Sequence, residues 1–217
     1  MNLLILAANG QIARIVEKRL LSEDKFKDIS LTLGLRQPKR LADLANNPRV
    51  RLLDVDMENQ ESVSQAVAGQ DMIFTAVVDH DPDNKMTRNI ISAMKAHNVS
   101  RIISTNILGI YDEVPGEFGR WNRLMVKSGL AAATQSDTLL SQSGLAYTTL
   151  RLPWLTDRDE VSYQITHKND QFVGGVSGSR KSVADLVLKM ITDPSLGVND
   201  SLGLADPATQ GKNRPVY

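Results

Sequence analysis

Short apolar segments alternate with amphipathic segments through the first half of this chain of 217 residues. The apolar segments are five expected strands, at residues 3–6, 29–35, 50–55, 72–78 and 101–107. Between them, apolar residues recur at the spacing of one helix face, as Ile12, Val16 and Leu20 do after the first strand. Such alternation favours a parallel sheet with right-handed crossovers and helices on both faces. The sequence therefore predicts an α/β fold with a doubly wound parallel sheet.

Small residues form the turn between the first strand and the helix that follows it. A helix that starts directly after a strand points unpaired N–H groups at the strand end, where they can bind a phosphate. The dinucleotide-binding fingerprint G-x-x-G-x-x-G/A would fall on Ala7, Gly10 and Ala13. Only the middle glycine is present, so this turn is equally consistent with a phosphate-binding loop and with an ordinary strand–helix connection.

Charge and composition exclude several classes of function. Lys and Arg total 25, as do Asp and Glu, so no net field draws the chain to nucleic acid or to an anionic membrane. The chain has no cysteine, which excludes disulfides, thiolate metal ligands and a cysteine nucleophile. The first apolar run lacks a basic flank and is too short for a signal peptide or a membrane span, so we expect a cytoplasmic protein.

A long irregular segment follows the fifth expected strand. Residues 108–120 contain three glycines, one proline, Tyr111 and Phe118. The segment is long for a plain connection between two elements of secondary structure. We therefore expect a lid or a substrate-binding loop here.

The second half of the chain alternates less clearly. Its expected elements are a helix at about 121–143, a strand at 147–152, a short strand near 161–165, a helix at 183–192 and a small edge strand at 202–205. We expect a single domain over residues 1–217 with a small C-terminal substrate-side subregion. The lid or substrate-side segments of this domain are about 108–120 and 153–181.

Basic residues follow the second strand at a position that selects between nicotinamide coenzymes. The strand ends at Arg36, and Arg40 follows shortly after it. An acidic residue at this point would bind the ribose 2′-hydroxyl of NAD, whereas a guanidinium suits the 2′-phosphate of NADP. NADP is therefore favoured, and a solvated basic turn is the alternative. We expect Asp56 and Met57 to lie beside the adenine, and their alternative role is to cap the helix that begins near Asn59.

Several short motifs occur together along the chain. They are Ala8–Ala13, Asp56-x-x-Asn59, Gly109–Tyr111, Trp121-Asn122, Tyr147–Thr156 and Ser179–Ala184. In this combination the chain resembles the atypical short-chain dehydrogenase/reductases, and within them the NmrA-like, NAD(P)H-binding bacterial branch. The resemblance covers nearly the whole chain, and it implies a Rossmann fold with bound NADP(H).

The resemblance also implies where the coenzyme binds. The implied contacts are Ala7, Asn9, Gly10, Gln11, Ile12, Arg36, Asp56, Met57, Thr75, Ala76 and Val77. The loop that starts at Pro153 would lie near the nicotinamide. One departure stands out: Ala7 replaces the glycine at which the first strand of the family turns, and its methyl group would crowd the backbone or the pyrophosphate.

The usual proton donor of this superfamily is missing from the sequence. Typical members carry Tyr-x-x-x-Lys, in which the lysine lowers the pKa of the tyrosine so that it acts as a general acid. No tyrosine here has a lysine four residues later, and a tyrosine found in many close relatives falls on Ala133. The remaining catalytic candidates are Asn106, at the end of the fifth strand, and Tyr111. Asn106 would hydrogen-bond a carbonyl or carboxamide, or it is a structural amide of the interior.

Two main functions follow from these features. The first is an NADPH-dependent reductase that passes hydride to a planar small-molecule acceptor such as a flavin or a quinone, which takes its proton from water. The second is a non-catalytic NADP(H)-binding sensor that regulates a partner protein. A third interpretation is that Ala7 and its neighbours have weakened nucleotide binding altogether. The sequence makes no prediction of the oligomeric state.

No metal site is predicted. Residues 79–83 place carboxylates and an imidazole in one turn, and such groups are metal ligands. Consecutive residues of a turn point in different directions, however, which favours a solvated loop.

Overall fold

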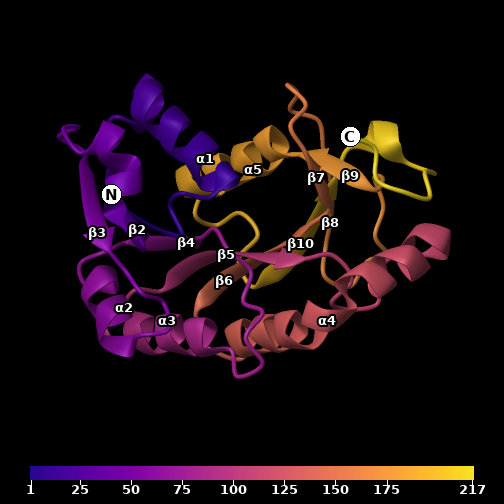
Figure 1. Cartoon of the computed structure of the whole chain (residues 1–217), viewed down its shortest axis with the longest axis horizontal. Helices are drawn as coiled ribbons and strands as arrows, with labels where there is room; N and C mark the ends of the chain where they lie inside the picture. The colour runs from indigo at the N-terminus through magenta and orange to yellow at the C-terminus, as the bar shows by residue number, and fades with distance from the viewer.

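The computed structural model describes residues 1–217 as a parallel sheet covered by helices on both faces (Figure 1). The main sheet has eight strands in the order β3-β2-β1-β4-β5-β6-β10-β8. Their bounds are β1 Asn2–Leu6, β2 Ser30–Leu35, β3 Val50–Asp54, β4 Met72–Thr75, β5 Arg101–Ile107, β6 Ala146–Leu152, β8 Gln164–Thr166 and β10 Asp200–Ala205. All neighbours pair in parallel except β8, which runs antiparallel to β10. A small second sheet pairs β7 (Trp154–Thr156) with β9 (Ser177–Ser179).

The helices divide between the two faces of the sheet. Helices α1 (Gln11–Ser22) and α5 (Arg180–Thr192) cover one face, the upper one in Figure 1. Helices α2 (Gln60–Val67), α3 (Lys85–Ala96) and α4 (Gly116–Ser141) cover the other. Short 3-10 helices form η1 (Asp24–Phe26), η2 (Pro38–Leu44) and η3 (Pro207–Thr209). The predicted doubly wound Rossmann-like fold is confirmed. None of the helices combines the length and the apolar character that a membrane-spanning helix needs.

The central strand is buried on both faces. Leu3 and Ile5 of β1 belong to the larger core, under α1 and α5. Leu4 and Leu6 belong to the second core, under α2 and α3. All four side chains are fully buried, and this explains why β1 is a continuous apolar run rather than an alternating one.

Two expectations for the second half need correction. The strand expected near residues 161–165 is the three-residue β8, and the expected edge strand at 202–205 is β10, which lies inside the sheet. β10 pairs with β6 on one side and with β8 on the other. The edge position therefore belongs to β8, because this short strand returns antiparallel along β10.

A buried ion pair holds the first part of segment 108–120 against the sheet. The guanidinium of Arg151, a fully buried residue of β6, lies 2.8 Å from the carboxylate of Glu113. The same carboxylate accepts the backbone N–H groups of Gly109 and Tyr111, each at 3.0 Å. The segment thus wraps around one buried carboxylate, and its function as a lid stays a prediction.

Helix α1 carries a second buried carboxylate. Glu17 is 1% exposed, and one of its oxygens lies 2.9 Å from the guanidinium of Arg14. Arg14 also pairs with Asp43 of η2 at 2.8 Å, while the other carboxylate oxygen of Glu17 has no partner. Burial raises the pKa of Glu17 to about 7, because the loss of hydration outweighs the attraction of Arg14.

The raised pKa of Glu17 predicts a pH-dependent stability. An unfolded glutamate titrates near pH 4.3, so the folded protein binds this proton more tightly than the unfolded chain does. The resulting stabilisation is present below about pH 4.3 and is lost as the pH rises through about 7. We expect Glu17→Gln to exceed the wild type in free energy of unfolding at pH 8, by up to about 3 kcal/mol, and to lose this advantage at pH 4.5.

Urea unfolding at the two pH values measures this difference. Glu23→Gln is the matched control of opposite sign, because hydrogen bonds from Arg19 and Lys25 lower the pKa of Glu23. A Glu17→Gln variant that is equally destabilised at both pH values contradicts the prediction.

Candidate functional site

A crevice of about 500 Å³ opens where β1, β2, β3 and β4 end. The order of the strands reverses between β1 and β4, and open α/β sheets bind ligands at such a reversal. The lining residues are Ala7, Asn9, Gly10, Leu35, Arg36, Arg40, Val55, Asp56, Met57, Glu58, Ala76, Val77 and Met86. The crevice thus draws on four loops that are far apart in the sequence.

Most of the predicted coenzyme contacts meet in this crevice. Those that line it are Ala7, Asn9, Gly10, Arg36, Asp56, Met57, Ala76 and Val77. The other four do not line it. Gln11 begins α1 and is exposed, Ile12 is buried in the core, Thr75 borders a separate small cavity, and Pro153 is buried between β6 and β7.

The turn between β1 and α1 is tight. The N–H of Gly10 donates to the carbonyl of Ala7 at 2.9 Å. A side-chain carbon at Gly10 would lie 3.3 Å from that oxygen and 3.5 Å from the carbonyl oxygen of Ala76, so only glycine fits without displacement. Ala7 has a φ of +58°, which a residue with a side chain rarely adopts. Alanine therefore takes a backbone conformation that glycine adopts more readily.

The first turn of α1 is open to an anion. Its N-cap is Gly10, which has no side chain to accept the free N–H groups, and no acidic residue lies in the turn. Free N–H groups and the positive end of the helix dipole attract phosphate. The turn that was ambiguous in the sequence thus has the features of a phosphate-binding loop.

Two arginines border the crevice where β2 ends. Arg36 and Arg40 are both exposed, and neither guanidinium pairs with a carboxylate of the chain. Arg40 reaches the crevice because the backbone reverses at Gln37, with a φ of +63°, and η2 starts at Pro38. Asp56 and Glu58, from the loop after β3, bring two carboxylates to the same crevice. The sequence indicated the basic turn but not that Arg40 and Glu58 face the same space.

The loop after β3 caps α2 and also lines the crevice, and its contact with an adenine stays a prediction. Asp56 accepts the N–H of Glu58 at 3.0 Å, and Asn59 caps α2 by accepting the N–H of Ser62 at 2.9 Å. Asp56 and Met57 line the crevice at the same time. Capping therefore fixes the side of the crevice on which the adenine was expected.

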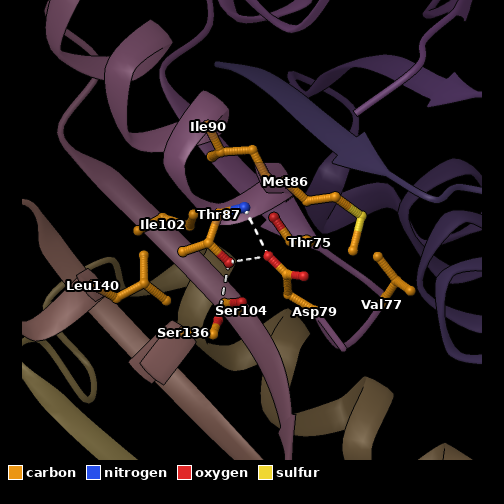
Figure 2. Close-up of a pocket in the computed structure, with 10 residues that line it drawn as sticks. All are labelled: Thr75, Val77, Asp79, Met86, Thr87, Ile90, Ile102, Ser104, Ser136 and Leu140. Carbon is orange, nitrogen blue, oxygen red and sulfur yellow. Dashed lines mark hydrogen bonds between the residues drawn. The ribbon is translucent and has the colours of Figure 1, made fainter. Parts of the chain in front are cut away.

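A small cavity of about 10 Å³ lies behind the crevice and shares Val77 and Met86 with it (Figure 2). The Asp79 carboxylate accepts the N–H and the hydroxyl of Thr87, at 3.0 and 2.7 Å. The Thr87 hydroxyl lies 3.0 Å from that of Ser136 on α4. These bonds tie α3 to α4 and fix the wall of the crevice, and the cavity has room for about one water molecule.

The acidic turn at residues 79–83 has a structural role. Asp79 faces Thr87, while the imidazole of His80 packs against Gly129 of α4. No group of three or more His, Asp, Glu or Cys side chains is arranged to hold a metal ion.

Asn106 is fully engaged by the backbone. Its amide nitrogen donates to the carbonyl of Ala133 at 2.9 Å, and its amide oxygen accepts the N–H of Ile107 at 2.7 Å. The side chain is 2% exposed. This geometry favours the structural alternative for Asn106, and its catalytic role stays a prediction.

Tyr111 is not among the residues that line the crevice. Its hydroxyl donates to the buried carboxylate of Asp137, and its ring lies 5.3 Å from the Arg151 guanidinium and 5.1 Å from the Lys168 ammonium. Burial and the bond to Asp137 raise the pKa of Tyr111. A nearby carboxylate has the opposite effect on a tyrosine from that of a lysine.

The conformation of Ala7 leads to a prediction about stability. An L residue in the left-handed region is strained by about 1–2 kcal/mol, whereas glycine adds about 0.4–1 kcal/mol of chain entropy to the unfolded state. We therefore expect Ala7→Gly to raise the free energy of unfolding by up to about 1 kcal/mol in urea titrations. Ala8→Gly is the control, because Ala8 is next to Ala7 but lies outside the left-handed region. We expect this substitution to lower the free energy of unfolding. Equal losses in both variants contradict the analysis of the turn.

Known proteins resemble this chain in sequence and structure. The family model described as NAD(P)H-binding matches residues 7–194. A Rossmann-fold NAD(P)-binding family protein from Shigella flexneri is 33% identical, with a TM-score of 0.77 over 100% of this chain and 98% of that chain. A short-chain dehydrogenase/reductase from Veillonella parvula, solved in complex with NADP, is 25% identical, with a TM-score of 0.90 over 100% and 99% of the two chains.

A more distant neighbour shows the same fold. ChuY, an anaerobillin reductase from Escherichia coli O157:H7, is 18% identical, with a TM-score of 0.80 over the full length of both chains. No curated protein matches the sequence. The family resemblance drawn from the motifs is confirmed, and the chain belongs to the NAD(P)H-binding family of Rossmann-fold proteins.

Proposed function

We propose that this protein binds NADP(H) in the crevice and uses NADPH to reduce a planar acceptor such as a flavin or a quinone. The pair of exposed guanidiniums at the end of β2, Arg36 and Arg40, carries this proposal. Guanidinium groups bind phosphate oxygens through paired hydrogen bonds, and an NADP-selective site needs such groups for the 2′-phosphate.

The crevice fits the coenzyme in its other parts as well. The uncapped first turn of α1 would bind the pyrophosphate, beside Asn9 and Gly10. Met57 would pack against the adenine, and Ala76 and Val77 would border the path toward the end of β5. When bound, NADPH supplies a hydride, and the residues of the chain would hold it in one orientation.

The choice of a planar acceptor follows from the missing acid. Asn106 uses both ends of its amide within the fold, and Tyr111 donates its hydroxyl to Asp137. An acceptor with a conjugated ring takes its proton from water, so the protein mainly has to align two rings. A reaction in which water supplies the proton needs no Tyr-x-x-x-Lys pair in the site.

The same lack of an acid favours a second candidate, a non-catalytic NADP(H) sensor. A sensor needs a coenzyme site but no proton donor. Steady-state assays of NADPH oxidation with riboflavin and menadione separate the two functions. We expect turnover with at least one acceptor. No turnover with either, together with different affinities for NADP⁺ and NADPH, would support the sensor and contradict the reductase.

The positions of Arg36 and Arg40 predict that replacing either one lowers the affinity for NADPH but not for NADH. Each charge-assisted hydrogen bond to a phosphate contributes about 1.5–3 kcal/mol, so Arg36→Ala and Arg40→Ala should each weaken NADPH roughly tenfold to a hundredfold. NADH has no 2′-phosphate, and its affinity should stay the same. Calorimetric titration measures both coenzymes. Lys39→Ala, an exposed cation of the same turn that does not line the crevice, is the control. Equal losses for NADPH and NADH would show that these arginines do not select the coenzyme.

A further inference from the structure

Both tryptophans of the chain lie together beyond the ends of β5 and β6. Trp121 belongs to α4 and Trp154 begins β7, and their ring centres are 4.8 Å apart. Ile107, at the end of β5, pairs with Leu152, at the end of β6, and Trp154 follows two residues later. The tryptophan pair therefore stands at the edge of the sheet at which the crevice opens.

The position of the pair along this edge relates it to the crevice. The crevice uses the ends of β3, β2, β1 and β4, and the next strands in the sheet are β5 and β6. Neighbouring strands are about 4.8 Å apart, so β6 ends roughly 10 Å beyond β4. A coenzyme whose adenine half lies beside Met57 would extend past Val77 toward β5. A ring that continued in this direction would approach the side of the sheet on which Trp154 stands.

The pair is held rigidly. The indole N–H of Trp154 donates to the Asn122 side chain at 3.0 Å, and the Asn122 amide donates to the carbonyl of Leu108 at 3.0 Å. Phe118 stacks on Trp121 with ring centres 6.0 Å apart. Both indoles are half-buried, and the polar atom of Trp154 is satisfied within the protein. They therefore present aromatic surface in a fixed orientation.

Residues 212–217, here called the strap, cover part of this surface. The Arg214 guanidinium lies 5.5 Å from the ring centre of Trp121 and pairs with Glu117 of α4 at 3.2 Å. The N–H of Val216 donates to the hydroxyl of Ser177 on β9 at 2.8 Å, and Figure 1 shows this end of the chain beside β9. The side chains of Arg214 and Glu117 are 52% and 49% exposed, and ion pairs this exposed contribute little to stability.

We propose that Trp121 and Trp154 form a platform on which a planar aromatic acceptor stacks, and that the strap moves aside when the acceptor binds. This proposal rests on the proposed reductase function and assigns its acceptor site. The guanidinium of Arg214 is itself a planar group on the Trp121 ring, so it occupies the position that a ligand ring takes. The acceptor replaces this small exposed contact with a larger aromatic one.

Riboflavin binding to the NADP⁺-loaded protein tests the platform. Equilibrium dialysis gives the affinity without requiring turnover. We expect Arg214→Ala to bind riboflavin about fivefold more tightly, because the competing cation and its ion pair are lost. Glu117→Gln, which breaks the ion pair but keeps the guanidinium, should give a smaller gain. Trp121→Leu should weaken riboflavin at least about tenfold.

Arg120→Ala is the matched control. Arg120 is an exposed arginine of the same helix that has no ion-pair partner, and its substitution should leave the affinity unchanged. The emission of the two tryptophans is a second measurement, since both belong to the platform. Arg214→Ala should shift the emission of the free protein to longer wavelength because the strap uncovers the indoles, and Arg120→Ala should not.

The outcomes separate this proposal from the proposed function. Unchanged riboflavin affinity in Arg214→Ala, or no binding in either this variant or the wild type, overturns the platform and strap even if Trp121→Leu does not fold. If the wild type binds and oxidises NADPH, and Arg214→Ala binds riboflavin with the same affinity as the wild type, the platform and strap are contradicted but the proposed function is not. A wild type that does not retain NADP⁺ contradicts the proposed function, and the riboflavin series on the unloaded protein still decides for or against the platform.

Discussion

The burial of β1 on both of its faces is the constraint on which the rest of the structure depends. β1 pairs with β2 on one side and with β4 on the other, and Leu3 to Leu6 are removed from water above and below the sheet. Right-handed crossovers send α1 to one face on the way to β2, and α3 to the opposite face on the way from β4 to β5. The crevice opens at the carboxyl ends of the strands, where the start of α1 supplies Gly10 and the first turn of α3 supplies Met86. The site is therefore a geometric result of how the central strand is covered.

The first half of the fold was predictable because its signals are local. Each of β1 to β5 is an apolar run followed by an amphipathic segment, and the structure has these strands in the expected places, except that β4 ends at Thr75 instead of continuing to residue 78. β8 and β9 have three residues each, which is too short for a pattern. The position of β10 inside the sheet depends on pairing with strands distant in sequence, which no local pattern contains.

The candidate site was predictable to a similar extent. Residues directly after a strand, such as Gly10, Arg36 and Asp56, could be placed at the crevice because the carboxyl ends of parallel strands meet at one edge. The position of Arg40 could not be predicted, because its side chain reaches the crevice only through the backbone reversal at Gln37 and the 3-10 helix η2. The Ala133 carbonyl bonded by Asn106 and the Asp137 carboxylate bonded by Tyr111 could not be predicted either, because both lie on α4, far along the chain. Tertiary hydrogen bonds of this kind decide whether a polar residue is structural or reactive.

The electrostatics of α4 distinguish Tyr111 from a tyrosine that is paired with a lysine. A lysine beside a tyrosine stabilises the phenolate, whereas Asp137 stabilises the neutral phenol of Tyr111. The buried pair of Glu113 and Arg151 then fixes the loop that carries this tyrosine. The phenol is thus held in its neutral form within a packed network of hydrogen bonds and buried charges.

The inner position of β10 has a consequence for how the chain folds as it is synthesised. Strands β2 to β6 each find a neighbour that has already been made, because the sheet grows from β1 outward on both sides. β8 is different, since its one partner in the sheet is β10, which leaves the ribosome later. Until then the edge of β6 and the segment that contains β8 stay unpaired, and exposed strand edges are the places where chains associate wrongly. The nascent protein is thus most vulnerable to aggregation just before its final strand emerges.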